Sequence, residues 1–330
     1  MRRLIAIVLC FAPLVIAAEV PPPRTQSGNP NYRVVHGWPT LPPGEVLGSA
    51  AGVDVDSHEA VFVFHRAGRT WQEPLPTTLI QRPTIAVFDG ASGRLLRQWG
   101  AGLFAMPHGL TIDGEDNVWV TDVALHQVFK FSPSGALLLT IGERAVPGND
   151  ETHFNRPTDV AVLPDGSFYV SDGYRNTRIV HFAADGRFLL QWGRPGSGPG
   201  EFNVPHAIKV DAQGNVYVAD RQNDRIQVFT AGGRFIRQWQ SQRMGRPYSL
   251  ALMGRGLIAV ADGGEQPQQG PDRSGIALVN RSGDVVSTFG RFGNYDGQFR
   301  MAHDVAADRQ GNLYVVDITG QRVQKFMARR

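Results

Sequence analysis

Short runs of Val, Ile, Leu, Phe and Tyr recur along the chain, separated by turn-forming pairs such as Asp-Gly, Gln-Gly and Ser-Gly. Such runs between turn signals are typical of short β-strands. Four runs form a unit, and its clearest copies cover residues 104–142, 154–193 and 202–240. A fourth copy, 299–326, stops early, and two divergent copies contain VFVFHR and LIAVADGG. Four strands per unit and a period of roughly 40–50 residues are typical of propeller blades, so the sequence predicts an all-β fold, a six-bladed β-propeller.

The last copy of the unit lacks its fourth run, because the chain ends soon after Phe326. The extended segment 31–38, NYRVVHGW, precedes the first complete unit and is expected to supply the missing strand. Closing the ring in this way joins the two ends of the chain and leaves no open blade face. We therefore predict one propeller domain over residues 31–330. A solenoid of six units is the alternative, and the incomplete last unit argues against it.

The chain starts with MRRLIAIVLCFAPLVIAAEV, in which two arginines precede an apolar stretch and two small residues, Ala17 and Ala18. This pattern predicts a cleaved signal peptide at 1–18, too short to be read as a membrane span. Residues 19–30, EVPPPRTQSGNP, are predicted to be a disordered linker. We therefore expect a secreted or periplasmic protein without a membrane span.

Cleavage of this leader also changes the charge and the thiol content. The formal net charge of +3 includes Arg2 and Arg3, which leaves about +1 for the mature chain. Without a clustered basic stripe, nucleic acid is not an expected partner. Cys10 is the only cysteine, so the mature chain would have no disulfide, no cysteine metal site and no cysteine nucleophile.

One repeat position carries the candidate chemistry. Its occupants in blades one to six are Ala51, His108, Thr158, His206, Tyr248 and His303. Equivalent positions in a ring of six lie about 60° apart, so alternate blades place three imidazoles about 120° apart. If this position faces the axis, the three form a set with an open fourth position, as in catalytic zinc sites; iron, copper and nickel also accept imidazole. A single histidine before a strand is more often a hydrogen-bonded structural residue, but strict alternation is hard to explain by packing.

A second group of residues follows the second strand of the blades. Arg66 and Arg221 take equivalent places in blades one and four, opposite each other across the ring, and Tyr174 stands one residue further along in blade three. Two guanidinium groups and a phenol near a metal would form a pocket that binds anions and transfers protons. On spacing alone, each arginine is more often a surface residue, and Tyr174 could simply cap a blade.

The sequence of the repeats resembles the NHL family of propellers. The resemblance rests on F-x-x-P followed by GNVYVAD and NDRIQVF within 202–229. A more specific resemblance covers about 33–326. The strings VFVFHRAGRTW, MPHGLTIDGEDNVWVTDVALHQVFKF, YVSDGYRNTRIVHF, FNVPHAIKV and MAHDVAAD strongly resemble peptidyl-α-hydroxyglycine α-amidating lyases. A shared propeller fold alone would not indicate the chemistry, because propellers include binding modules as well as enzymes.

The resemblance to these lyases implies a role for each candidate residue. His108, His206 and His303 would bind the catalytic metal, usually described as zinc. Arg66 would bind the substrate, Tyr174 would be the catalytic tyrosine, and Arg221 would be a further active-site arginine. A structural calcium would be held by the backbone carbonyls of Val53 and Leu110 and by Asp304. The disulfide cysteines of the animal enzymes are absent here, where Asn155, Arg175 and the neighbourhood of Tyr217 stand in their place.

The resemblance implies a metal-dependent lyase that splits an N-acyl- or peptidyl-α-hydroxyglycine into a primary amide and glyoxylate. Tyr174 is the expected base, and a water activated by the metal is the alternative. No monooxygenase domain is recognised in this chain, so a separate copper monooxygenase is the expected source of substrate. Two other functions remain open at this point. One is a secreted propeller without catalytic activity that binds a peptide or envelope partner, and the other is a metalloenzyme acting on another small carboxylate.

Overall fold

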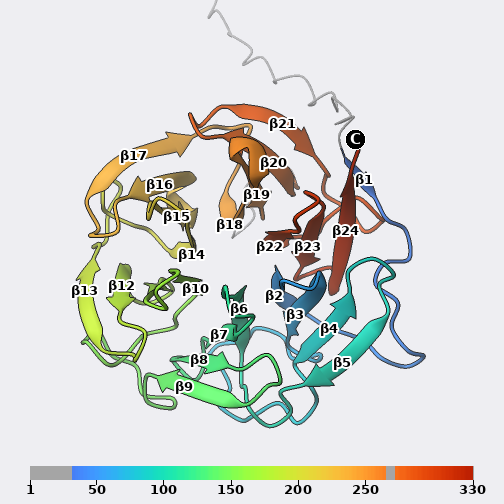
Figure 1. Cartoon of the computed structure of the whole chain (residues 1–330), viewed down its shortest axis with the longest axis horizontal. Helices are drawn as coiled ribbons and strands as arrows, with labels where there is room; N and C mark the ends of the chain where they lie inside the picture. The colour runs from blue at the N-terminus through green and yellow to red at the C-terminus, as the bar shows by residue number, and fades with distance from the viewer. Residues whose placement is uncertain (1–31, 265–271, 330) are drawn as a thin grey trace, which may run out of the picture.

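The computed structural model describes residues 32–264 and 272–329, and it arranges them as six four-stranded antiparallel sheets around one axis (Figure 1). Each sheet is built from consecutive hairpins, because glycines and Asp-Gly or Asn-containing turns interrupt the apolar runs. The first strand of each blade lies nearest the axis and the last lies at the rim (Figure 1). The predicted six-bladed propeller is therefore confirmed.

The blades follow one another along the chain. Blades one to three contain β2 (Ala50–Val55), β3 (Ala60–His65), β4 (Ile85–Asp89) and β5 (Leu95–Trp99); β6 (Pro107–Ile112), β7 (Val118–Asp122), β8 (Gln127–Phe131) and β9 (Leu137–Ile141); β10 (Asp159–Val162), β11 (Phe168–Asp172), β12 (Arg178–Phe182) and β13 (Phe188–Trp192). Blades four to six contain β14 (Pro205–Val210), β15 (Val216–Asp220), β16 (Arg225–Phe229) and β17 (Phe235–Gln240); β18 (Pro247–Leu252), β19 (Leu257–Asp262), β20 (Gly275–Asn280) and β21 (Val285–Phe289); β22 (Ala302–Ala307), β23 (Leu313–Asp317), β24 (Arg322–Ala328) and β1 (Tyr32–Val34). The described chain also has two short 3-10 helices, η1 (Arg221–Asn223) and η2 (Gly254–Gly256), and none of its helices is long and apolar enough to cross a membrane.

The ring closes through the last blade. Strand β1 pairs antiparallel with β24, with Tyr32 opposite Ala328 and Val34 opposite Phe326, so the segment near the N-terminus completes blade six. The Tyr32 hydroxyl also donates a hydrogen bond to the Gly311 carbonyl at 2.8 Å. This confirms the closure predicted from the missing strand. The predicted signal peptide and linker, 1–18 and 19–30, lie outside the described residues.

Apolar side chains hold consecutive blades together face to face. The second strands, such as β7, β11, β15 and β23, are buried along their whole length, because a neighbouring blade covers each of their faces. Between blades one and six, Val53 and Phe88 meet Tyr314 and Val316. Near the axis the inner strands approach so closely that a Cβ added to Gly52 would lie 2.7 Å from the Leu110 nitrogen.

A buried ion pair recurs at the end of the second strand. Four aspartates each accept a hydrogen bond from an arginine at the start of the third strand: Asp172 from Arg178, Asp220 from Arg225, Asp262 from Arg273 and Asp317 from Arg322. The same aspartates also accept backbone N–H groups of the loop that leads into the blade. The pair therefore ties that loop, on which the site residues depend, to the sheet.

Replacing Arg225 with methionine is expected to lower the free energy of unfolding by about 3–5 kcal/mol, because it leaves the buried Asp220 carboxylate without its partner. Arg225 is 3% exposed and its other nitrogens donate to backbone carbonyls of the preceding loop. Urea unfolding measures the change. The matched control is Arg194→Met, whose partner Glu201 and own side chain are partly solvated, 24% and 77% exposed; that pair should contribute less than about 1 kcal/mol. Equal effects of the two substitutions would contradict the prediction.

Candidate active site

Three histidines from alternate blades meet at the axis of the ring. His108, His206 and His303 lie on the innermost strands β6, β14 and β22, and all three are almost completely buried. Their ring centroids are 4.8 to 4.9 Å apart, and one nitrogen of each lies within 4.8 Å of the other two. Within the described residues, no other group of three or more His, Cys, Asp or Glu side chains converges in this way.

The backbone of the next blade holds each imidazole in place. The Nδ1 atoms of His108, His206 and His303 lie 2.7 Å from the carbonyl oxygens of Thr158, Tyr248 and Ala51, respectively. A carbonyl oxygen only accepts, so Nδ1 carries the hydrogen and each Nε2 keeps its lone pair for the axis. Histidines that bind metals are commonly oriented by such a second hydrogen bond. The three carbonyls belong to the same repeat position in the intervening blades, so the three rings are oriented in the same way.

Burial lowers the pKa of all three histidines below their ordinary value, to about 3 for His303. The positive charge of Arg221 lowers the pKa of all three in addition, and that of Arg66 lowers the pKa of His108 and His303. The imidazoles are therefore neutral near pH 7, which is the form that donates a lone pair to a metal. With three inward nitrogens and no thiolates, the residues present fit a divalent transition metal such as zinc.

The phenol of Tyr174 lies directly over this group. Its hydroxyl oxygen is 3.0 Å from His108 Nε2 and 3.1 Å from His206 Nε2. Tyr174 is in the tight connection between β11 and β12, where its own N–H donates to the Arg156 carbonyl at 3.4 Å. A hydroxyl in this place is close to whatever the histidines bind.

Two guanidinium groups flank the tyrosine. Arg66 follows β3, is 3% exposed and donates from Nε to the Pro107 carbonyl at 3.0 Å; burial lowers its pKa to about 10, so it stays charged near pH 7. Arg221 begins η1, and its Cζ is 5.4 Å from the ring centroid of Tyr174 and 4.9 Å from that of Tyr248. Within the described residues, Arg221 Nε has no hydrogen-bond partner. The six residues singled out in the sequence thus surround one place, which suits a small anionic ligand.

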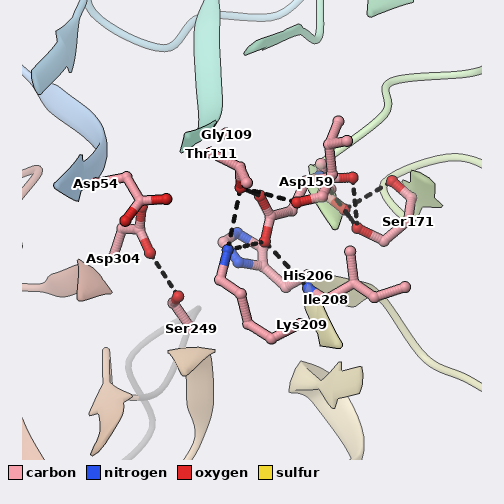
Figure 2. A network of polar contacts seen from close by, with 12 residues as sticks. Asp54, Gly109, Thr111, Asp159, Ser171, His206, Ile208, Lys209, Ser249 and Asp304 are labelled. Atoms are coloured by element: carbon pink, nitrogen blue, oxygen red, sulfur yellow. Dashed lines mark hydrogen bonds and ion pairs between the residues drawn. The ribbon is translucent and has the colours of Figure 1, made fainter. Parts of the chain in front are cut away.

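A network of charged side chains lies in the same channel, next to the histidines (Figure 2). Lys209 Nζ donates to Asp159 Oδ2 at 3.0 Å and to Thr111 Oγ1 at 3.3 Å. Burial alone would lower the pKa of Lys209, but Asp159, Asp304 and Asp54 raise it above its ordinary value. Three carboxylates thus surround one ammonium group. Asp54, Thr111 and Lys209 share one repeat position, and Asp159 and Asp304 share another. The repeat pattern alone did not reveal the network, because it does not show which of these side chains meet.

The surroundings of Asp304 fit a hard cation. Its carboxylate accepts from Val53 N at 2.9 Å and from the Ser249 hydroxyl at 2.5 Å, and burial raises its pKa. The Val53 N–H points toward Asp304 from an inner strand edge, and a carbonyl in a strand lies on the same side as its N–H. Leu110 has the equivalent place on β6. Asp54, which the sequence did not suggest, is a further acidic group near Lys209. Such oxygen donors are those calcium prefers.

A cavity of about 10 Å³ lies between the histidines and this network, lined among others by Asp159 and Asp304. Such a volume holds about one water-sized particle. A larger hollow of about 640 Å³ lies elsewhere, between β9 and β13. None of the predicted site residues lines it, so its size does not make it the better candidate.

Family models and known proteins match this chain. A model of the NHL repeat matches residues 104–131, and a model described as a 6-bladed beta-propeller matches 148–242. The solved streptogramin B lyase has a TM-score of 0.58 at 12% identity, covering 91% of this chain and 98% of that one. At such low identity the likeness concerns the fold alone.

Relatives with much higher identity are found among curated proteins. Peptidyl-glycine alpha-amidating monooxygenase A of Xenopus laevis is 39% identical over 300 residues, which are 85% of this chain and 32% of that protein. Peptidyl-alpha-hydroxyglycine alpha-amidating lyase 2 of Drosophila melanogaster is 35% identical over 319 residues, which are 90% of this chain and 74% of the fly protein. The chain therefore spans about a third of the amphibian relative and most of the fly relative.

Proposed function

Because the chain belongs to the family of peptidyl-α-hydroxyglycine α-amidating lyases, we propose that it cleaves the N–C bond of an N-acyl- or peptidyl-α-hydroxyglycine. The products would be a primary amide and glyoxylate, so the enzyme would be a carbon–nitrogen lyase. The observation that carries this proposal is the position of the Tyr174 hydroxyl, about 3 Å from the inward nitrogens of two of the three histidines. Two buried or nearly buried arginines accompany it.

Two ions belong to the proposal. His108, His206 and His303 would hold zinc or another divalent transition metal. That ion would supply a Lewis acid, which makes the hydroxyl of the substrate easier to deprotonate. The carbonyls of Val53 and Leu110 and the carboxylate of Asp304 would hold a structural calcium, with Asp54 nearby as a further acidic group.

Arg66 would bind the substrate carboxylate. Its guanidinium is planar and can make two parallel hydrogen bonds to a carboxylate, and its burial strengthens that attraction because the local dielectric constant is low. Arg221 would add positive potential beside Tyr174, where negative charge develops as the hydroxyl loses its proton. The two arginines approach Tyr174 from blades one and four, so they would fix the substrate from opposite sides.

Tyr174 would move the proton. In its phenolate form, the oxygen would take the proton of the carbinol hydroxyl. The oxygen–carbon bond would become the carbonyl of glyoxylate, and the electrons of the C–N bond would leave with the nitrogen. The nitrogen then receives one proton, which makes the primary amide. One proton leaves oxygen and one reaches nitrogen, so the reaction needs no oxidant or reductant. Positioned acid–base groups of this kind typically contribute about 10²–10⁴-fold to a rate.

The setting of the enzyme completes the proposal. We infer secretion or export to the periplasm from the N-terminal sequence. A separate copper monooxygenase would supply the hydroxylated substrate, since relatives of this chain are named peptidyl-glycine alpha-amidating monooxygenases.

Glyoxylate release from N-benzoyl-α-hydroxyglycine by the purified protein tests the function. We expect rapid release, and a fall of about a thousandfold after a chelator removes the transition metal, because Lewis-acid assistance contributes several kcal/mol. Adding zinc back should restore the rate. Protein that carries its metal and releases no glyoxylate would contradict the proposed reaction, while release that persists in metal-free protein would contradict the role of the histidines.

A further inference from the structure

Blade one has an unusually long connection beside the site. Residues 66–84 join β3 to β4 without forming a strand. The same connection is short in blade two, from Asp122 to Gln127, and in blade four, from Asp220 to Arg225. A connection of this length without secondary structure is uncommon inside a regular domain and is usually functional. The insertion therefore calls for a role that the blade itself does not require.

The connection is held in place at several points. Arg69 Nη1 donates to the Ala105 carbonyl at 2.7 Å, and the Ile80 N–H donates to the Phe104 carbonyl at 2.7 Å. Glu73 makes two parallel hydrogen bonds with Arg156, at 2.7 and 2.9 Å, and bonding to Arg156 lowers the pKa of Glu73. Arg156 belongs to the loop leading into blade three, which also binds the backbone of Tyr174. The connection thus reaches from blade one to the segment that positions the catalytic phenol.

Trp71 is the side chain that this arrangement brings to the site. The ring centroid of Trp71 is 5.3 Å from the ring centroid of Tyr174. The Arg66 Cζ lies 5.4 Å from the Trp71 centroid. Trp71 is 37% exposed, whereas Trp38, Trp119 and Trp239 are at most 7% exposed. An indole that is both partly solvated and in contact with two active-site groups is available to a ligand.

The direction of the substrate follows from the groups that hold it. The proposed function places the substrate carboxylate at Arg66 and the substrate hydroxyl near the Tyr174 oxygen. The position of the amide nitrogen and of the acyl group remains to be determined. The histidines close the inner side, because they are buried to 4% exposure or less. The acyl group must therefore extend outward, past Tyr174, where Trp71 stands.

We propose that Trp71 forms the wall of a subsite for the acyl group of the substrate, and that the 66–84 connection places it there. This inference rests on the proposed lyase function. The subsite favours an aromatic or other bulky apolar group next to the hydroxyglycine, since an aromatic wall gains most from flat or apolar partners. Small acyl groups such as acetyl reach the same catalytic groups without that contact.

The test compares N-benzoyl- with N-acetyl-α-hydroxyglycine. In Trp71→Ala, kcat/KM for the benzoyl substrate should fall about two- to tenfold further than for the acetyl substrate, because aromatic pairs contribute about 0.5–1.5 kcal/mol. Trp71→Phe should keep most of the preference. Tyr295→Ala, which removes an aromatic side chain that is 78% exposed in the loop before β22, is the matched control and should change neither substrate. Equal losses for both substrates would overturn the subsite and leave Trp71 as a support for Tyr174.

A binding measurement separates the subsite from the reaction. N-Benzoylglycine and N-acetylglycine carry the carboxylate and acyl group but no hydroxyl, so they bind without turnover. Calorimetry on the metal-loaded wild type should show tighter binding of the benzoyl compound, and Trp71→Ala should lose that preference. If the wild type releases no glyoxylate but keeps the preference, the lyase proposal fails and the subsite stands. If the wild type binds both analogues equally, the subsite is wrong even where glyoxylate release is fast.

Discussion

Replacing His206 with alanine is expected to remove the transition metal from the protein and to lower glyoxylate release by about a thousandfold or more. The substitution leaves two imidazoles on the axis, too few for a stable site of the three-histidine type. The fold should survive, because His206 is not part of the apolar clusters that hold blade four against its neighbours. The main structural cost is the loss of the hydrogen bond from His206 Nδ1 to the Tyr248 carbonyl oxygen, which are 2.7 Å apart. A buried carbonyl left without a partner costs about 1–3 kcal/mol.

Metal content per chain after gel filtration and glyoxylate release are the two measurements for this variant. Circular dichroism checks that the propeller is intact. His58→Ala is the control, because the His58 side chain is 80% exposed in the β2–β3 turn and does not belong to the three-histidine group. A His206→Ala protein that keeps one transition metal per chain and full turnover would show that the three histidines are not the metal ligands.

Replacing Tyr174 with phenylalanine should lower kcat by about 10²–10⁴-fold, the usual contribution of a positioned acid–base group. The ring remains, so its contacts with Trp71 and Arg221 persist and only the hydroxyl near the histidines is lost. Metal content should stay at the wild-type value, since the three imidazoles are untouched. KM should change little, because Arg66 is the proposed carboxylate ligand.

Tyr169→Phe is the matched control for this substitution. Its hydroxyl donates to the Ala231 carbonyl at 2.9 Å, away from the axis, so its loss should lower stability and leave turnover unchanged. Stopped-flow or single-turnover measurements would separate the chemical step from product release. Full turnover in Tyr174→Phe would remove this residue from the proton transfer and would leave that role to another group.

The architecture was predictable because most contacts within a blade join residues that are close in sequence. Four consecutive strands joined by hairpins need contacts between residues that are near in sequence, so turn signals and apolar runs suffice to identify them. Even the closure of the ring could be predicted, since the last copy of the repeat lacks one strand and an unassigned extended segment precedes the first. Strand β1 beside β24 is the confirmation of that reasoning.

The same regularity made the three histidines predictable. Residues at one repeat position are related by rotation about the axis, so His108, His206 and His303 had to be arranged symmetrically, whatever the details of packing. What the repeat did not reveal is what orients the three rings. The structure shows that the backbone carbonyls of Thr158, Tyr248 and Ala51 do so. A carbonyl leaves no mark in the sequence, because every residue has one.

The sequence by itself determined the number of blades, the closure of the ring and the convergence of the histidines, because all three follow from periodic, local patterns. Tertiary structure alone decided the placement of Trp71 against Tyr174, and the network of Lys209 with Asp159 near Asp304. Trp71 is carried by an insertion that has no counterpart in the regular repeats. Lys209 and Asp54 share one repeat position and Asp159 and Asp304 share another, but the repeat does not show which of these side chains meet. Contacts of this kind depend on distances across the axis, and no repeat pattern encodes those distances.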